Sequence, residues 1–207
     1  ESSRLVGAAP PSDHQLFYTE TALQRAESIS RRGEQTEPAV ESGGILLGLL
    51  GWCPDAQDAF VLVVDALEAP DADQREFSLS FSSKTWSCLQ AVVRARRAQP
   101  GEGALRIVGQ THGHPFSPGE PCAACPETPD CPKHTAFLSE DDHRWSRAVF
   151  AGQPWQVGHM WGINARGEPT TNVYGLCGGR LERRGYRLLA ADDLSRIRQA
   201  STTQGSS

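Results

Sequence analysis

Apolar and polar residues follow two patterns along this chain, one typical of strands and one typical of helices. Short apolar runs, or strict alternation, bounded by turn-forming residues indicate strands. The predicted strands are 16–18, 44–52, 59–67, 77–81, 104–108, 155–163 and 171–176. Apolar residues three or four positions apart, behind a serine or threonine that can cap, indicate helices. The predicted helices begin at Thr19 or Thr21, at Ser82 or Ser83, and at Ser139, and they end near residues 31, 98 and 150.

The order of these elements predicts one α/β or α+β domain with a mixed sheet between helices. A chain of 207 residues can bury one substantial core. We place this domain at 14–180, after a flexible polar segment, 1–13. Residues 116–138 form an insertion in the domain. Residues 181–207 form a largely polar extension with one short element at most.

Composition limits the cellular compartments and the classes of binding partner that we expect for this chain. The net charge of −5 and the pI near 5.7 argue against a surface that binds nucleic acid. No apolar run reaches the length that crosses a membrane, and no signal-peptide pattern opens the chain, so we expect a cytoplasmic protein. In a reducing compartment, six cysteines favour metal binding over disulfides.

Two histidines separated by one residue follow the apolar run 104–108. On an extended strand, His112 and His114 project from the same face and can converge on one ion. Imidazole suits zinc, and a catalytic zinc needs a third protein ligand and an open position. The best candidate is Asp142, in the first turn of the helix that begins near Ser139, although Asp141 is adjacent. The same Ser-x-x-Asp sequence is also a helix-capping pattern.

The insertion carries a second set of possible ligands, Cys122, Cys125, Cys131 and His134. Two such pairs close together can bind zinc tetrahedrally in a closed structural site. The segment contains almost no apolar residues, so a metal is a plausible means of ordering it. His143 is an alternative fourth ligand. The other interpretation is a loop with free thiols or a local disulfide.

A further acidic residue, Glu41, stands just before the strand-like run 44–52. The ordered set of Glu41 with Gly-Gly-x-Leu-x-Gly, then His-x-His-Pro, then Ser-x-x-Asp resembles the JAMM (MPN+) metalloprotease family. The resemblance covers most of the chain, about 16–174. The chain departs from the family in one respect, because the usually short link between the last two motifs is replaced here by the long insertion.

The resemblance implies an MPN/JAB-like fold and a zinc-dependent protease. Zinc would be held by His112, His114 and Asp142, with Glu41 as the general base and Ser139 as a hydrogen-bond donor to the developing oxyanion. Related enzymes cleave after the C-terminal Gly-Gly of ubiquitin or a ubiquitin-like protein, whose tail lies extended beside the site. The size and composition favour a bacterial member, and bacterial relatives occur with ubiquitin-like modifiers, including in antiviral defence systems.

Two other functions stay open at this point. The same site could trim the precursor of a modifier or of a sulfur carrier. Alternatively, the chain could be a binding module, because many MPN relatives are scaffolds that have lost their ligands. The presence of Glu41 and all three expected ligands favours an enzyme.

Overall fold

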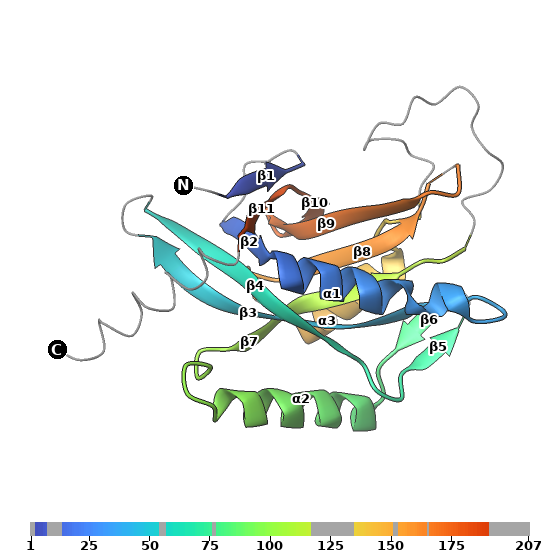
Figure 1. The fold of residues 1–207 in the computed structure, drawn as a ribbon, viewed down its shortest axis with the longest axis horizontal. Coiled ribbons are helices and arrows are strands. Elements are labelled where there is room, and N and C mark those ends of the chain that lie inside the picture. The colour runs from blue at the N-terminus through green and yellow to red at the C-terminus, as the bar shows by residue number, and fades with distance from the viewer. Residues whose placement is uncertain are drawn as a thin grey trace.

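A nine-stranded mixed sheet dominates the computed structural model, which describes residues 3–7, 14–53, 57–75, 78–116, 135–150, 153–164 and 166–190. The strands lie in the order β1-β11-β2-β4-β3-β7-β8-β9-β10 (Figure 1). Their bounds are β1 Arg4–Val6, β2 Gln15–Thr19, β3 Ser42–Cys53, β4 Asp58–Glu68, β7 Arg106–Gly113, β8 Val157–Ile163, β9 Pro169–Cys177, β10 Arg180–Arg183 and β11 Tyr186–Leu189. A separate hairpin pairs β5 (Asp73–Arg75) with β6 (Ser78–Ser80).

Three α-helices pack on the sheet, α1 (Glu20–Arg31), α2 (Ser83–Arg97) and α3 (Glu140–Val149), and a 3-10 turn, Arg32–Gln35, follows α1. Helix α1 crosses one face, while α2 and α3 lie on the other (Figure 1). Each begins at a residue that the sequence predicts as a cap: Thr19, Ser82 and Ser139 all accept a hydrogen bond from a backbone N–H in the first turn. No helix in these ranges is long and apolar enough to cross a membrane.

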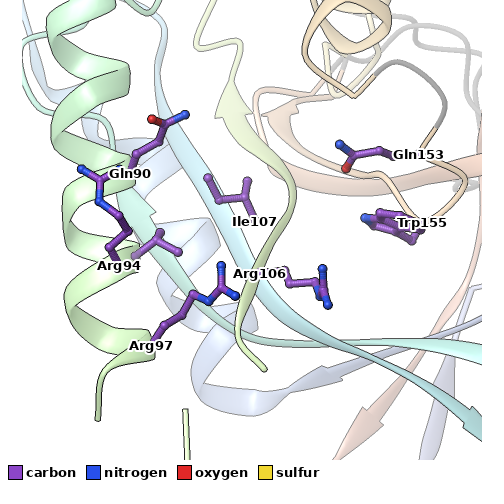
Figure 2. Close-up of a pocket in the computed structure, with 8 residues that line it drawn as sticks. Gln90, Arg94, Arg97, Arg106, Ile107, Gln153 and Trp155 are labelled. Carbon is purple, nitrogen blue, oxygen red and sulfur yellow. The ribbon is translucent and has the colours of Figure 1, made fainter. Parts of the chain in front are cut away.

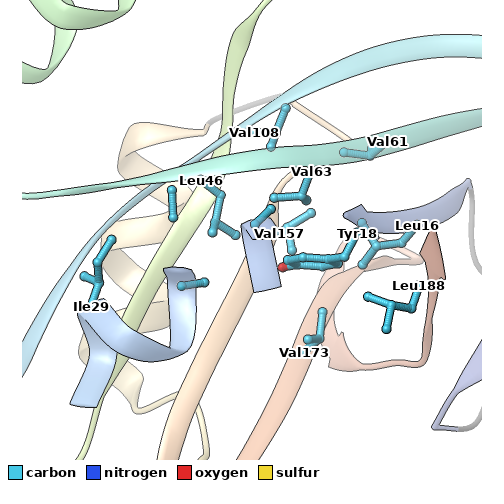
Figure 3. Packing of buried hydrophobic residues seen from close by; sticks show 13 residues of the cluster. Leu16, Tyr18, Ile29, Leu46, Val61, Val63, Val108, Val157, Val173 and Leu188 are labelled. Atoms are coloured by element: carbon cyan, nitrogen blue, oxygen red, sulfur yellow. The ribbon is translucent and has the colours of Figure 1, made fainter. Parts of the chain in front are cut away.

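The apolar residues divide between the two faces of the sheet. Under α1, strand residues such as Leu16, Tyr18 and Val63 pack against Ile29 and its neighbours on the helix (Figure 3). Under α2, Ile45 and Leu47 pack with Leu89, Val93 and Leu105. Strand β3 contributes to the core on both faces of the sheet, with Leu46 under α1 and with Ile45 and Leu47 under α2. Burial on both faces explains why 44–52 is an almost continuous apolar run rather than an alternating one.

The prediction of an α+β fold with a mixed sheet is confirmed, and the sheet extends beyond residues 14–180 to include β1, β11 and most of β10. Strand β11 inserts between β1 and β2, antiparallel to β1 and parallel to β2. We expected a flexible segment where β1 lies, and one short element at most from Arg183 onward, where the described residues contain β11. Both β1 and β11 have only three or four residues, too few to produce a periodic signal, and pairing in the sheet stabilises them.

Strand β7 contains a β-bulge, which determines the face of the sheet to which its second half directs its side chains. In its pairing with β3, Leu46 lies opposite Gly109 and Leu47 lies opposite Ile107, so Val108 is an extra residue. Such a bulge changes the face to which the following side chains point. Beyond it, Thr111 faces α1, where its hydroxyl contacts the Ser30 hydroxyl at 2.7 Å. The residues on either side of Thr111, including His112, consequently face α3.

Candidate metal centre

Glu41, His112 and His114 lie close together at the end of two paired strands. In the antiparallel pairing of β3 with β7, Ser42 lies opposite Gly113, so the residues just outside this pair are neighbours. The Oε1 atom of Glu41 is 3.5 Å from Nε2 of His114, and one ligand atom from each of the three residues lies within 4.8 Å of the others. All three are buried, at 5%, 2% and 2% exposed. This group could hold a metal ion.

Asp142 reaches the same place from the first turn of α3. Its Oδ1 atom lies 3.0 Å from Nε2 of His112, and its Oδ2 atom lies 3.8 Å from Nε2 of His114. Oδ2 also accepts hydrogen bonds from the backbone N–H and the hydroxyl of Ser139, both at 2.8 Å. The Ser-x-x-Asp sequence is therefore a helix cap and a site element at once. Asp141, the alternative ligand, is 82% exposed and pairs with Arg144.

A backbone carbonyl fixes the orientation of His114, whereas His112 faces the carboxylate of Asp142. Nδ1 of His114 lies 2.8 Å from the carbonyl oxygen of Thr135, so Nδ1 carries the proton and Nε2 presents its lone pair to the site. Nε2 of His112 instead faces Oδ1 of Asp142 at 3.0 Å, and its Nδ1 has no hydrogen-bond partner among the described residues. A buried imidazole nitrogen that faces carboxylate oxygens needs a proton or a cation between them. The donor set therefore fits a bound metal.

The backbone around the site leaves no room for side chains beside the histidines. A Cβ atom on Gly43 would lie 2.3 Å from the carbonyl oxygen of Thr111 and 2.6 Å from Cβ of His112. The start of β3 is also held against α1, because the Ser42 hydroxyl donates a hydrogen bond to the carbonyl oxygen of Ile29 at 2.9 Å. Gly43 thus lets β3 approach β7 closely enough for Glu41 to reach the histidines, while Gly44 allows the same close approach to Leu67 on β4.

The charges in the site perturb one another strongly. Burial raises the pKa of Glu41 to about 7; the positive charge on His112 opposes this rise, and Asp142 adds to it. Burial and His112 together lower the pKa of His114 to about 4. Burial would lower the pKa of His112, but Asp142 and Glu41 outweigh it and raise that pKa. Burial would raise the pKa of Asp142, but His112 and Ser139 hold it well below its usual range.

Without metal, the raised pKa of His112 favours a proton on that ring, between the two carboxyl groups. A divalent cation bound to the same atoms would replace that proton, because a metal-binding imidazole must be neutral. Metal binding to this site is consequently expected to release protons and to weaken at acidic pH.

Three residues of the site were not predicted from the sequence. Phe116 stacks on the ring of His114 with centroids 5.2 Å apart, and Phe137 lies at the same distance on a tilted plane. Phe137 is 39% exposed, so the site has an apolar wall that faces solvent. Thr135 holds His114 from a position 21 residues away. None of these contacts has a local sequence signal, because each depends on how the chain returns after the insertion.

The predicted structural zinc site lies outside the described residues. This applies to all four of its ligands, Cys122, Cys125, Cys131 and His134, so the second metal stays a prediction. The alternative ligand His143 lies on α3, within the described part of the chain.

Comparisons with known proteins leave the family open. Neither protein-family models nor curated proteins give a match. Among solved structures, the chain is similar to the solution structure of protein DSY2949 from Desulfitobacterium hafniense, with 15% sequence identity and a TM-score of 0.44. That alignment covers 85% of this chain and 92% of the other. So distant a likeness supports no conclusion about function.

Proposed function

We propose that this protein is a zinc-dependent peptidase of the JAMM type that cleaves after the C-terminus of a ubiquitin or ubiquitin-like protein. The observation that carries the proposal is the convergence of Glu41, His112, His114 and Asp142, from three separate elements, in one buried site. These are the four residues that the family resemblance assigns to ligands and base.

The donor set supports zinc as the metal. Two imidazole nitrogens and one carboxylate are a common combination for a catalytic zinc with an open position. When bound, zinc would polarise a carbonyl group and lower the pKa of a coordinated water toward neutrality. His112, His114 and Asp142 would hold the ion, and the Thr135 carbonyl and Ser139 would keep two of these ligands oriented.

Glu41 is suited to moving a proton at neutral pH. A general base works best when its pKa lies near the working pH, and the pKa of Glu41 is about 7. In the proposed reaction, its carboxylate accepts a proton from the attacking water and returns it to the leaving amine. The predicted role of Ser139 toward the oxyanion requires its hydroxyl to turn from Asp142, to which it now donates.

A short hairpin beside Glu41 supports an extended peptide as substrate. The backbone N–H of Glu41 donates to the carbonyl oxygen of Arg75, at 2.7 Å, which ties β5 to the site. Glu41 thus occupies the outer edge of β5 at Arg75, while β6 pairs with no described strand other than β5, which leaves the outer edge of β6 for a further strand. An extended tail could add to such an edge through its backbone, and a terminal Gly-Gly would fit closely at the metal.

The test compares cleavage and zinc content in matched variants. The substrates are a ubiquitin-like protein ending in Gly-Gly, fused linearly to a second protein or joined to a lysine, which separates precursor trimming from deconjugation. Glu41→Gln should retain zinc and lose cleavage, whereas Asp142→Ala should lose both. Asp141→Ala removes an exposed neighbouring acid and should behave as wild type.

Two results would contradict the proposal. Wild-type turnover in Glu41→Gln would remove the assigned base. Binding of the modifier with zinc in place, but without cleavage by any variant including wild type, would instead indicate a non-catalytic binding module.

A further inference from the structure

A second cavity, separate from the metal centre, lies between α2, the beginning of β7 and the residues before β8 (Figure 2). Its volume is about 350 Å³, within the range of small-molecule sites. The polar side chains that line it are Arg94, Arg97, Arg106, Gln90, Gln153 and Trp155. Arg106 and His112 are six residues apart on β7, so about 20 Å of strand separates this cavity from the candidate metal centre.

The cavity exists because β8 begins later than β7. The pairing of these two strands starts at Gly109 with Val157, so β7 has no β8 partner over 106–108 among the described residues. Chain 153–155 approaches this unpaired edge from one side, and α2 approaches it from the other. In Figure 2, the Arg97 side chain extends from α2 toward β7, and Arg106 lies between Arg97 and Trp155 in this view.

The lining is rich in donors and positive charge. In the described part of the chain, none of Arg94, Arg97 and Arg106 forms an ion pair, and no acidic side chain lines the cavity. Their neighbour Arg96 differs, because it pairs with Asp65 and Glu102. The indole N–H of Trp155 is buried and has no acceptor among the described residues. Three guanidinium groups without an acidic partner favour a ligand with several anionic oxygens.

Phosphate suits this lining better than a single carboxylate. A guanidinium group binds phosphate oxygens through two parallel hydrogen bonds, and a phosphate monoester carries about −1.5 to −2 charges near neutral pH. Two linked phosphates would therefore balance the three arginines. The partly exposed ring of Trp155 offers a flat surface for a planar group, and the amides of Gln90 and Gln153 can bond to its polar edge.

We propose that this cavity binds a phosphorylated small molecule of nucleotide size, with its phosphates on Arg94, Arg97 and Arg106 and a planar ring against Trp155. A nucleic acid is a poorer candidate, because the chain as a whole is acidic and only three arginines meet at this small cavity. The proposal does not depend on the peptidase activity, because none of these residues belongs to the metal centre.

Isothermal titration calorimetry of the full chain would test this with four probes: adenosine diphosphate, pyrophosphate, adenosine, and a single-stranded DNA oligonucleotide. We expect adenosine diphosphate to bind more tightly than pyrophosphate, and adenosine not to bind. Arg97→Gln with Arg106→Gln should weaken binding by roughly tenfold or more, since each removes a hydrogen bond to a charged group. Arg180→Gln removes one positive charge on β10, as each of these single substitutions does in the cavity, and should leave binding unchanged. Thermal melts and zinc content should match wild type in all variants, because Arg97 and Arg106 are exposed.

The proposal is overturned if neither adenosine diphosphate nor pyrophosphate binds at millimolar concentration. It is also overturned if the double variant binds as wild type does, if pyrophosphate binds as tightly as adenosine diphosphate, or if only the oligonucleotide binds.

Discussion

Replacing Glu41 by glutamine should stabilise the metal-free protein at neutral and alkaline pH. The substitution keeps the shape of the side chain and removes its charge. Glu41 is 5% exposed, and burial raises its pKa from 4.5 to about 7. Folding therefore favours the protonated carboxyl. The stability associated with that proton is fully present below pH 4.5, falls as pH rises, and is lost once pH exceeds about 7.

The size of the effect follows from the two pKa values. One pKa unit corresponds to about 1.4 kcal/mol, so ionisation of Glu41 costs the folded state about 3 kcal/mol above neutral pH. Urea unfolding with chelator present, near pH 5 and near pH 8, would measure this. Between these conditions, wild type should lose about 2 kcal/mol more of its unfolding free energy than Glu41→Gln does.

His112 also has a raised pKa, so part of the wild-type loss comes from that residue, and the variant should keep the share of it that Asp142 causes. The informative quantity is thus the difference between the two proteins. Asp141→Asn is the matched control, since it removes one exposed acid in the same region and should run parallel to wild type. If Glu41→Gln runs parallel to wild type as well, Glu41 ionises as freely when folded as when unfolded, and its role as a tuned base is refuted.

Three further predictions concern the metals and their supports. Purified wild type should carry about two zinc ions per chain by elemental analysis, and His114→Ala should lose one; an unchanged count would remove the catalytic site. Thr135→Val removes the hydroxyl that donates to the His114 carbonyl and accepts from Ile163 N–H, both at 2.8 Å. It should lower the unfolding free energy by about 1 to 3 kcal/mol and weaken zinc roughly tenfold in chelator competition, whereas equal affinity would show that Thr135 is dispensable. Cys125→Ser should lower the melting temperature and the turnover if the insertion holds a structural zinc; unchanged stability, zinc content and turnover would make the cysteines incidental.

Much of the candidate site could be predicted because its signals are local. Strand residues that are two positions apart lie on the same face of a sheet, which places His112 beside His114. A serine three residues before an acid marks a helix start, which places Asp142 in the first turn of α3. Glu41 was located through the family resemblance, and the pairing of β3 with β7 then explains its position.

The rest depends on tertiary pairing that no local pattern encodes. Strands β1 and β11 are stabilised by each other and by β2, which are distant in the sequence. The bulge at Val108 is set by the mismatch between β3 and β7. From the sequence alone, Arg94 and Arg97 indicate the solvated face of a helix. Only the fold places Arg106 and Trp155 around the same cavity. Pairings between distant segments are the information that a single sequence lacks.

The contact between His114 and Thr135 has a consequence for how this chain tolerates changes in length. The Thr135 hydroxyl lies 2.8 Å from the His114 carbonyl oxygen, so two residues 21 positions apart are held side by side. The entropy of closing a loop between fixed ends grows only with the logarithm of its length. Doubling the number of residues between these anchors should therefore cost about 0.6 kcal/mol of unfolding free energy. A single deletion between Thr111 and His114 would instead turn a histidine to the opposite face of the sheet. Insertions between His114 and Thr135 should therefore change stability little, whereas a change in length between Thr111 and His114 should disrupt the site.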